Sequence, residues 1–374
     1  MEISAASGVI LPVRESLSCS RACTTRRGNR PELCMKQEAD IIALLAREIP
    51  SRIGARHPAD VPLGIGDDAA VVRVRRGRDW VVSTDAFIEG RHFLEKLHPP
   101  FAVGFKALAR AVSDLAAMGA TPRYFLLTLA LPARRTGDWL RSFARGMGHG
   151  ARMFRMHLIG GDVSRDTHVH AAVTVIGEAP RHGVLKRAGG KPGDALYVTG
   201  RLGAAQAGFE ALSRRGARAF LTRARPYWFE RHALPNPRLA IGQLLAERRL
   251  ASAAMDISDG LSTDLARLCA ASQVGAVIHA ARIPLAGTGH TWKRGVDPQR
   301  DLAAEIDRAL HGGEDYELLF AVPRRHVSRV PAEAGGVPIT RIGELTKRRT
   351  VLLETSGRMR KLRPEGWDHF AISR

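Results

Sequence analysis

The sequence has few cysteines and no long hydrophobic run. Of four cysteines in 374 residues, Cys19, Cys23 and Cys34 fall near the start, where no histidine lies nearby. Their spacing matches no common zinc pattern, so free thiols are the simpler interpretation. A single further cysteine, Cys269, excludes a disulfide-stabilised fold and favours a reducing, cytoplasmic compartment. No apolar stretch approaches the roughly 20 residues of a membrane helix, so no membrane partner is expected.

The familiar nucleotide and hydrolase motifs are also missing. The chain has no GxxxxGK[ST] loop, no GxGxxG after a strand, no protein-kinase HRD and DFG set, and no Gly-x-Ser-x-Gly elbow. The segment GRLG (Gly200–Gly203) is too short a pattern to count. P-loop, protein-kinase and serine-hydrolase architectures are therefore not expected. A nucleotide enzyme with this sequence would belong to a less common fold.

Positive charge is in excess, with 57 Lys and Arg against 37 Asp and Glu and a formal net charge of +20. Such a balance raises the question of nucleic acid as a partner. The basic clusters are short, spread along the chain and not interleaved with aromatic residues. We therefore do not expect nucleic acid to be the main partner, although the charge suits small polyanions such as nucleotides.

Hydrophobic periodicity predicts an α/β (α+β) protein of two domains. Residues 1–35 lack periodicity and are expected to form a poorly structured extension. Residues 36–180 and 181–374 are expected to form an N-terminal and a C-terminal α/β domain, joined near the glycine-rich segment KRAGGKPGD. In the first domain, strands are predicted at 69–74, 80–84, 124–131 and 169–177, and helices at 101–118 and 138–152.

Carboxylates recur beside glycine or hydroxyl residues, mostly where a predicted strand ends. They are Asp67 and Asp68 in GIGDDAAVV, Asp85 after Ser83 and Thr84, Asp162 in LIGGD, Asp256 and Asp259 in MDISDG, and Glu314 and Asp315 in HGGED. Each alone could be a turn residue or a helix cap. Asp114 is different, because it lies in the middle of an apolar helical stretch beside Leu108, Val112 and Leu115. A carboxylate in that place is neither a cap nor a freely solvated side chain.

These carboxylates together predict magnesium-dependent nucleotide chemistry. Clustered carboxylates raise one another's pKa unless hard cations lie among them. Mg²⁺ takes oxygen ligands, keeps several waters and bridges carboxylates to phosphates. The neighbouring glycines would let backbone N–H groups approach phosphate oxygens.

The ordered set of motifs resembles the thiamine-monophosphate kinase family. The motifs are GIGDDAAVV (64–72), STDAFIEGRHF (83–93), KALARAVSDLAAMGATP (106–122), LIGGD (158–162), LKRAGGKPGDALYVTG (185–200), MDISDGLSTDL (255–265), GGEDYELLF (312–320) and GWDHF (366–370). This resemblance implies the two-domain fold of the aminoimidazole-ribotide synthetase superfamily. It also implies a homodimer in which the N-terminal halves pair, with the ATP site near that interface.

The resemblance further implies a reaction and a set of site residues. The implied reaction is phosphorylation of thiamine monophosphate by ATP, in which several Mg²⁺ ions screen the charge of two polyanions and no general base is needed. Metal positions would be Asp68 (supported by Asp67), Ser83, Thr84, Asp85, Asp114, Asp162, Asp256 and Asp259, of which Asp85, Asp114 and Asp162 would be catalytic. Gly161, Asp162, Arg187 and Ser258 would contact the nucleotide, and His92, Glu314 and Trp367 would hold thiamine monophosphate.

Alternatives remain for single residues and for the whole chain. Trp367 could be a core tryptophan and His92 a plain surface histidine. A sister enzyme of the same superfamily would act on a ribotide, selenide or a carbamoyl group instead. Selenide chemistry is disfavoured because no cysteine closely precedes GIGDD, and STDAFIEGRHF with GGEDYELLF and GWDHF favours the thiamine branch. A nucleic-acid-binding protein is the alternative from a different class.

Overall fold

The structure is a computed structural model of the 374-residue chain. It describes residues 38–50, 58–61, 65, 70–73, 76–181, 183–216, 227–287 and 298–367. The extension expected over residues 1–35 and the paired carboxylates Asp67 and Asp68 lie outside the described residues. None of the helices in these ranges is long and apolar enough to cross a membrane.

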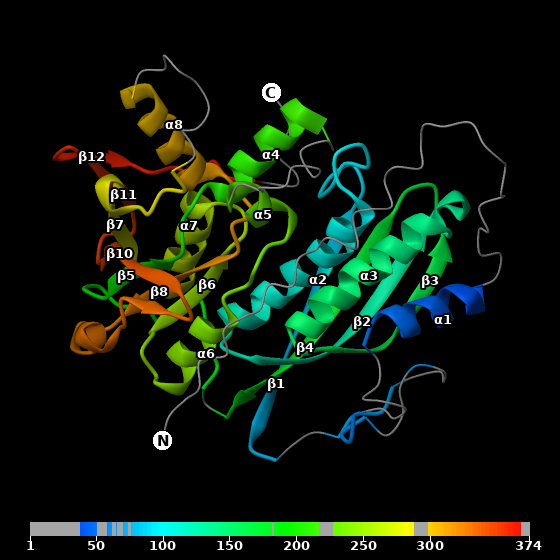
Figure 1. Ribbon diagram of the computed structural model, residues 1–374. Coiled ribbons are helices and arrows are strands. Elements are labelled where there is room, and N and C mark those ends of the chain that lie inside the picture. Colours follow the sequence, from blue (N-terminus) through cyan, green and yellow to red (C-terminus); the bar gives the residue numbers. More distant parts are fainter. Residues whose placement is uncertain are drawn as a thin grey trace.

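The N-terminal half is a four-stranded sheet with helices packed on one face (Figure 1). In spatial order its strands are β1 (Arg78–Ile88), β4 (His170–Pro180), β2 (Thr121–Leu131) and β3 (His157–Arg165). All neighbours pair antiparallel except β2 and β3. Helix α2 (Pro100–Ala117) packs on β1 and β4, α3 (Asp138–Met153) lies along α2, and α1 (Glu38–Glu48) contacts α3. The other face of this sheet, away from α2 and α3, is called the outer face below.

The core of this half explains why α2 forms where it does. Its apolar positions Leu108, Val112 and Leu115 are fully buried against Phe125 of β2 and Val173 of β4. The helix begins with a proline in its first turn, where the missing N–H costs nothing, and it is followed by Gly119 at a φ of +69°. The helices predicted at 101–118 and 138–152 are therefore confirmed as α2 and α3.

Three strand predictions need correction. Residues 70–73 form no regular strand; Ala70 and Val72 pack against Tyr124 and Ile159 on the outer face, whereas Val71 is exposed. Asp85 does not end its strand, since β1 continues to Ile88, and Asp162 lies inside β3, which continues to Arg165. Backbone pairing with β4 and β2 carries both strands past the polar residues that suggested an end.

The C-terminal half is built on a second, larger sheet. The spatial order is β12-β11-β7-β10-β5-β8-β6, with β9 paired to β10. The strands are β5 (Ala195–Thr199), β6 (Ala253–Ile257), β7 (Gly275–His279), β8 (Glu317–Val322), β9 (Glu333–Ala334), β10 (Val337–Thr346), β11 (Val351–Thr355) and β12 (Arg358–Lys361). The helices are α4 (Ala204–Arg215), α5 (Tyr227–Ala233), α6 (Leu239–Glu247), α7 (Leu261–Ser272) and α8 (Pro298–His311). Short 3-10 helices lie at 133–135, 280–282 and 324–329.

Helix α2 joins the two halves. Its last residues, Ala116 and Ala117, belong to an apolar cluster that also holds Ile241 and Leu245 of α6. The approach of α2 to α6 is close enough that a Cβ on Gly242 would lie 1.9 Å from the backbone oxygen of Ala116. Helix α2 therefore packs on the N-terminal sheet and also contacts the C-terminal half, from Ala102 near its start to Ala117 at its end (Figure 1).

Candidate active site

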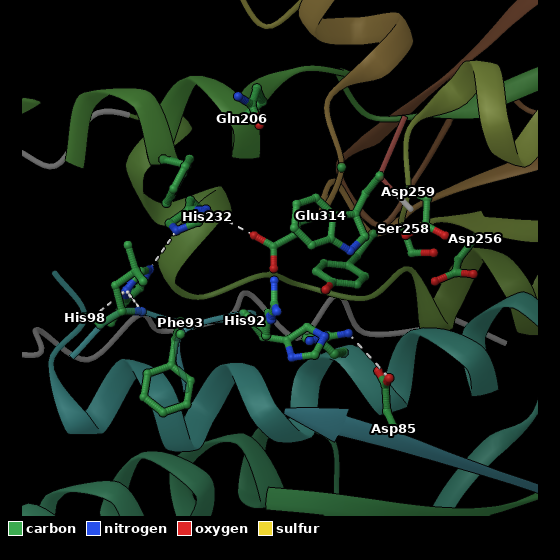
Figure 2. A pocket seen from close by; sticks show the side chains of 18 of the residues that line it. Asp85, His92, Phe93, His98, Gln206, His232, Asp256, Ser258, Asp259 and Glu314 are labelled. Carbon is green, nitrogen blue, oxygen red and sulfur yellow. Dashed lines mark hydrogen bonds and ion pairs between the residues drawn. The ribbon is translucent and has the colours of Figure 1, made fainter. Parts of the chain in front are cut away.

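A cavity of about 480 Å³ opens between the two halves. Its lining includes Asp85, Arg91, His92, Phe93, His98, Arg110 and Asp114 from the N-terminal half, and Gln206, His232, Asp256, Ser258, Asp259, Glu314, Tyr316 and Trp367 from the C-terminal half. In Figure 2, the carboxylates of Asp256 and Asp259 lie on one side, the imidazoles of His98 and His232 lie on the other, and Glu314 lies between them. The cavity thus gathers most of the residues that the sequence predicted for the site.

Three charged residues of α2 form a column that faces this cavity. Lys106, Arg110 and Asp114 follow one another at intervals of four residues, so they lie on the same side of the helix. Of the three, only Asp114 was predicted from the sequence. The available signal for the other two was weaker, namely their spacing of four residues from Asp114 along the same helix.

Glu314 is held ionised at the centre of the cavity. Lys106 Nζ lies 2.7 Å from Glu314 Oε2, and His232 Nδ1 lies 3.4 Å from the same oxygen. Burial raises the pKa of Glu314, but the positive charge of Lys106, the hydrogen bond that it donates and the weaker effects of other nearby cations together outweigh burial and lower the pKa to about 2. The residue has a φ of +68°, and its N–H donates to the carbonyl oxygen of Ser258 at 2.7 Å. A carboxylate is thereby fixed in the charged form and aimed at the cavity.

Two carboxylates from opposite halves meet at the next part of the cavity. Asp256, at the end of β6, is 4% exposed and accepts a hydrogen bond of 2.7 Å from the Ser113 hydroxyl. Burial and then the nearby charge of Asp114 raise the pKa of Asp256 to about 8. Asp114 in turn accepts a hydrogen bond from the Ser83 hydroxyl. Among the described residues, no group of three or more His, Cys, Asp or Glu side chains is close enough together to hold a metal ion.

The turn that carries Ser258 and Asp259 is fixed by a buried carboxylate that the sequence analysis did not single out. Asp264 accepts the backbone N–H groups of Ser258 and Asp259, each at 3.0 Å. Arg267 forms ion pairs with both Asp259 and Asp264. The position of Asp264 near the start of α7, five residues after Asp259, was the available signal for such a role.

His92 and Trp367, for which the resemblance implies substrate contacts, both line the cavity. The Ile88 N–H donates to His92 Nδ1 at 3.0 Å, and the imidazole stacks on Phe87 with ring centroids 5.9 Å apart. Trp367 is 47% exposed, and its backbone N–H donates to the carbonyl oxygen of Asp259 at 3.0 Å. Both side chains line the cavity, so neither a core tryptophan nor a plain surface histidine describes them.

Thr84 and Asp162 lie on the other side of the N-terminal sheet. Ser83 and Asp85 face the helices, so strand alternation turns Thr84 to the outer face, where Thr174 donates to its hydroxyl at 3.0 Å. Asp162 of β3 pairs with Thr128 of β2, which pairs with Ala172 of β4, and Ala172 pairs with the outer-face residue Ala86 of β1. Because paired residues share a face of the sheet, Asp162 also lies on the outer face. Neither Thr84 nor Asp162 lines the cavity.

Gly161 and Arg187 also lie outside the cavity lining. Gly161 has a φ of +155°, and a Cβ there would lie 1.9 Å from the Leu127 carbonyl oxygen, so the position requires glycine. Arg187 is exposed. Its positive charge nevertheless reaches Asp256 and partly offsets the rise in the pKa of Asp256 that burial and Asp114 cause. The predicted site residues therefore do not all converge: one group lines the cavity, Thr84 and Asp162 lie on the outer face, and Gly161 and Arg187 belong to neither group.

Comparisons with known proteins identify the family of the chain. Residues 66–179 match the family model described as AIR synthase related protein, N-terminal domain, and residues 191–354 match the corresponding C-terminal domain. The chain is 39% identical over 315 residues to the thiamine-monophosphate kinase of Escherichia coli K12, covering 83% of this chain and 93% of that protein.

Solved structures give the same result. The crystal structure of thiamine-monophosphate kinase from Stenotrophomonas maltophilia K279a has a TM-score of 0.71 at 33% identity, covering 84% of this chain and 95% of that one. The structure described as AaThiL complexed with AMPPCP and TMP has a TM-score of 0.66 at 30% identity, covering 82% of this chain and 92% of that one. These matches confirm the two-domain fold and the resemblance drawn from the motifs, and the chain belongs to the thiamine-monophosphate kinase family of AIR synthase related proteins.

Proposed function

We propose that this chain transfers the γ-phosphoryl group of ATP to thiamine monophosphate, giving ADP and thiamine diphosphate. The single observation that carries the proposal is the cavity between the halves, where an ionised Glu314 and an exposed Trp367 lie near a pair of repelling carboxylates. Support comes from the E. coli relative named thiamine-monophosphate kinase and from the related AaThiL complex with AMPPCP and TMP. Relatives with this name at 30% identity or more favour the thiamine branch over a sister enzyme of the superfamily.

The thiamine end of the acceptor would bind at Glu314, Trp367 and His92. Thiamine carries a cationic thiazolium and a flat aminopyrimidine, which suit an ionised carboxylate and an aromatic face. Lys106 contributes indirectly, because its charge keeps Glu314 ionised. The rigid backbone of Glu314, held through Ser258, would keep this recognition in a fixed place.

The phosphate end would lie at the carboxylates of the same cavity. Asp114 and Asp256 repel each other in a buried setting, and their serine partners Ser83 and Ser113 add hydroxyl oxygens, so the donor set fits a hard divalent cation. Mg²⁺ would be held here with help from Asp85 and Asp259, and when bound it would neutralise the negative charge of the phosphates. The acceptor phosphate is ionised at neutral pH, so the chain needs to position it and exclude water rather than remove a proton.

The outer-face group would serve the nucleotide in a homodimer. Thr84 and Asp162 lie on that face, Gly161 directly precedes Asp162 on β3, and Asp68 would join them as a further metal ligand. Apolar side chains are also exposed there, as Val82 of β1 is 58% exposed. We propose that two N-terminal halves pair through the outer face, with ATP near the interface and Arg187 and Ser258 contacting its phosphates.

The domain boundary and the cellular location are two further proposals. The domain boundary near residue 180 is supported by the end of β4 at Pro180 and by the separate sheet that starts with β5 at Ala195. A cytoplasmic location is supported by Cys269, a buried free thiol and the one cysteine within the described ranges.

The reaction can be tested directly with the purified full-length chain. ATP, Mg²⁺ and thiamine monophosphate are incubated with the enzyme, and thiamine diphosphate is measured by chromatography. We expect product only with thiamine monophosphate as acceptor and none with thiamine. Consumption of ATP with a ribotide or carbamoyl acceptor, and no thiamine diphosphate, would assign the chain to a sister activity instead. Retention on nucleic acid without turnover of ATP would support a binding protein.

A further inference from the structure

Arg110 is a buried cation without the hydrogen bonds that such a group normally has. Its side chain is 12% exposed and lines the cavity. In the described part of the chain, neither Nε nor Nη1 has a hydrogen-bond partner. Nη2 contacts Asp85 Oδ1 at 3.4 Å, which is longer than the roughly 2.7–2.9 Å of a strong charge-assisted hydrogen bond. Two nitrogens of the guanidinium are therefore buried without an acceptor.

Arg238 is a buried arginine whose donors do have an acceptor, and it provides a comparison for Arg110. Arg238 is 8% exposed, and Glu317 accepts from its Nε at 2.6 Å and from its Nη2 at 2.5 Å. Unsatisfied buried donors are costly, so a guanidinium that lacks such a partner is expected to meet one when a ligand binds. Because Arg110 lines the cavity, that ligand would enter the proposed active site.

The position of Arg110 along α2 identifies the part of the ligand that it meets. Lys106, one turn earlier, contacts Glu314 at the proposed thiamine end, and Asp114, one turn later, lies near Asp256 at the proposed metal end. Each step of four residues is about 6 Å along the helix axis. The guanidinium thus lies between the two ends, where the phosphate joined to thiamine would face the γ-phosphate of ATP.

The chemistry of the guanidinium fits the same group. A planar fork with open donors matches the oxygens of a phosphate, and the Phe87 ring, 5.3 Å from the guanidinium carbon, holds the plane in place. Building on the proposed function, we infer that Arg110 binds the phosphate of thiamine monophosphate directly and selects it over unphosphorylated thiamine. The phosphate would accept from donors that are unsatisfied in the absence of substrate.

The test is isothermal titration of the full-length enzyme in EDTA, so that no metal bridges ligand and protein. The wild type should bind thiamine monophosphate more tightly than thiamine. Arg110→Gln should lower the affinity for thiamine monophosphate by about tenfold to a hundredfold and leave the affinity for thiamine unchanged. Arg110→Lys should restore part of the loss, because it keeps the charge without the fork. Arg145→Gln, which removes an exposed arginine of α3, is the matched control and should change neither affinity.

Three results would overturn the inference. The first is equal affinity of the wild type for thiamine monophosphate and thiamine in EDTA. This result does not depend on whether any variant folds. The second is an Arg110→Gln enzyme, folded by circular dichroism, that keeps the preference for the phosphorylated ligand. The third, seen in a parallel titration with the ATP analogue AMPPCP, is a loss of affinity confined to that analogue, which would assign Arg110 to the nucleotide. Failure of the proposed function itself would look different, because the wild type would then form no thiamine diphosphate from any of these ligands.

Discussion

Ser113 on α2 donates a hydrogen bond of 2.7 Å to Asp256 on β6, so a polar contact joins the two halves at the floor of the cavity. The ion pair of Lys106 with Glu314, also 2.7 Å long, makes a second such contact two turns earlier on the same helix. Both acidic partners come from the C-terminal half, and both face the proposed site. The placement of these carboxylates therefore depends on α2.

Asp114→Asn should abolish turnover without harming the fold. The substitution removes the negative charge that repels Asp256. The free energy of unfolding in the absence of Mg²⁺ should therefore stay the same or rise. The proposed metal site loses a charged ligand, and kcat for thiamine diphosphate formation should fall by about a hundredfold or more. Thermal unfolding with and without Mg²⁺ should show a smaller gain from the metal than in the wild type.

Asp307→Asn is the matched control for that experiment. Asp307 is exposed on α8 and lies outside the cavity lining, so the same change of charge should leave kcat and the Mg²⁺ effect unaltered. Wild-type turnover in Asp114→Asn would contradict the assignment of this carboxylate. Equal loss in the control would point to a general effect of net charge.

The sequence revealed Asp114 but not its neighbours on the helix, for a physical reason. An apolar stripe makes a lone carboxylate conspicuous, whereas Lys106 and Arg110 look like ordinary solvated cations until their partners are known. Those partners are distant in sequence, since Glu314 follows Lys106 by 208 residues. Spacing along a helix predicts which residues share a face, but it does not predict which other element covers that face.

The two groups of predicted metal residues show a similar limit. The resemblance implies Ser83, Thr84 and Asp85 together as metal positions, yet a strand sends alternate side chains to opposite faces. The period of two already separates Thr84 from Asp85. The placement of Asp162 required more, because its face follows from pairing with Thr128, and that register depends on long-range contacts of β2 and β3.

Lys106→Met should destabilise the protein and leave Glu314 without its counter-charge. Removing one partner of a buried ion pair typically costs about 3–5 kcal/mol, because the other charge stays in a poorly solvated place. Lys106 is nearly fully buried while Glu314 is 29% exposed, so a cost near the lower end, about 3 kcal/mol, is expected. Urea denaturation of the wild type and the variant measures this difference.

The double variant Lys106→Met/Glu314→Gln provides the control for the ion pair. Neutralising both partners removes the uncompensated charge, so most of the lost stability should return. A double variant as unstable as Lys106→Met alone would mean that the lysine acts through packing of its stem. Binding of thiamine should remain weak in the double variant, because Glu314 is proposed to recognise the thiamine cation.

His98 should make the protein less stable as the pH falls below neutral. Burial, followed by the charge of Lys106, lowers the pKa of His98 from 6.5 to about 4. Between these values the unfolded chain binds a proton that the native state does not, so stability is full above pH 6.5 and is lost towards pH 4. The shift corresponds to roughly 3 kcal/mol. Urea denaturation at pH 7, 5.5 and 4 should show a slope that is reduced in His98→Gln but kept in His170→Gln, which changes an exposed residue.

His232 belongs to the same pH response. Its Nε2 lies 3.0 Å from His98 Nε2, and burial followed by the charge of Lys106 lowers its pKa well below 6.5. His232→Gln should therefore flatten the slope in the same direction. An unchanged slope in both variants would show that acid destabilisation arises elsewhere, for example from carboxylates.

Gly242→Ala should loosen the contact between α2 and the C-terminal half. A Cβ at this position would lie 1.9 Å from the Ala116 backbone oxygen, and a backbone atom cannot move aside as a flexible side chain can. Overpacking of this kind typically costs about 1–3 kcal/mol, which outweighs the better helix propensity of alanine. Thermal unfolding should therefore show a lower Tm, and kcat should fall as well, because Ser113 and Lys106 would no longer meet their partners in the same place.

Gly357→Ala is the control for this experiment. No atom lies within 4 Å of the added methyl group, so only the backbone strain at a φ of +79° affects stability. If Gly242→Ala lowered Tm but left kcat equal to that of Gly357→Ala, the joint between the halves would not control the site.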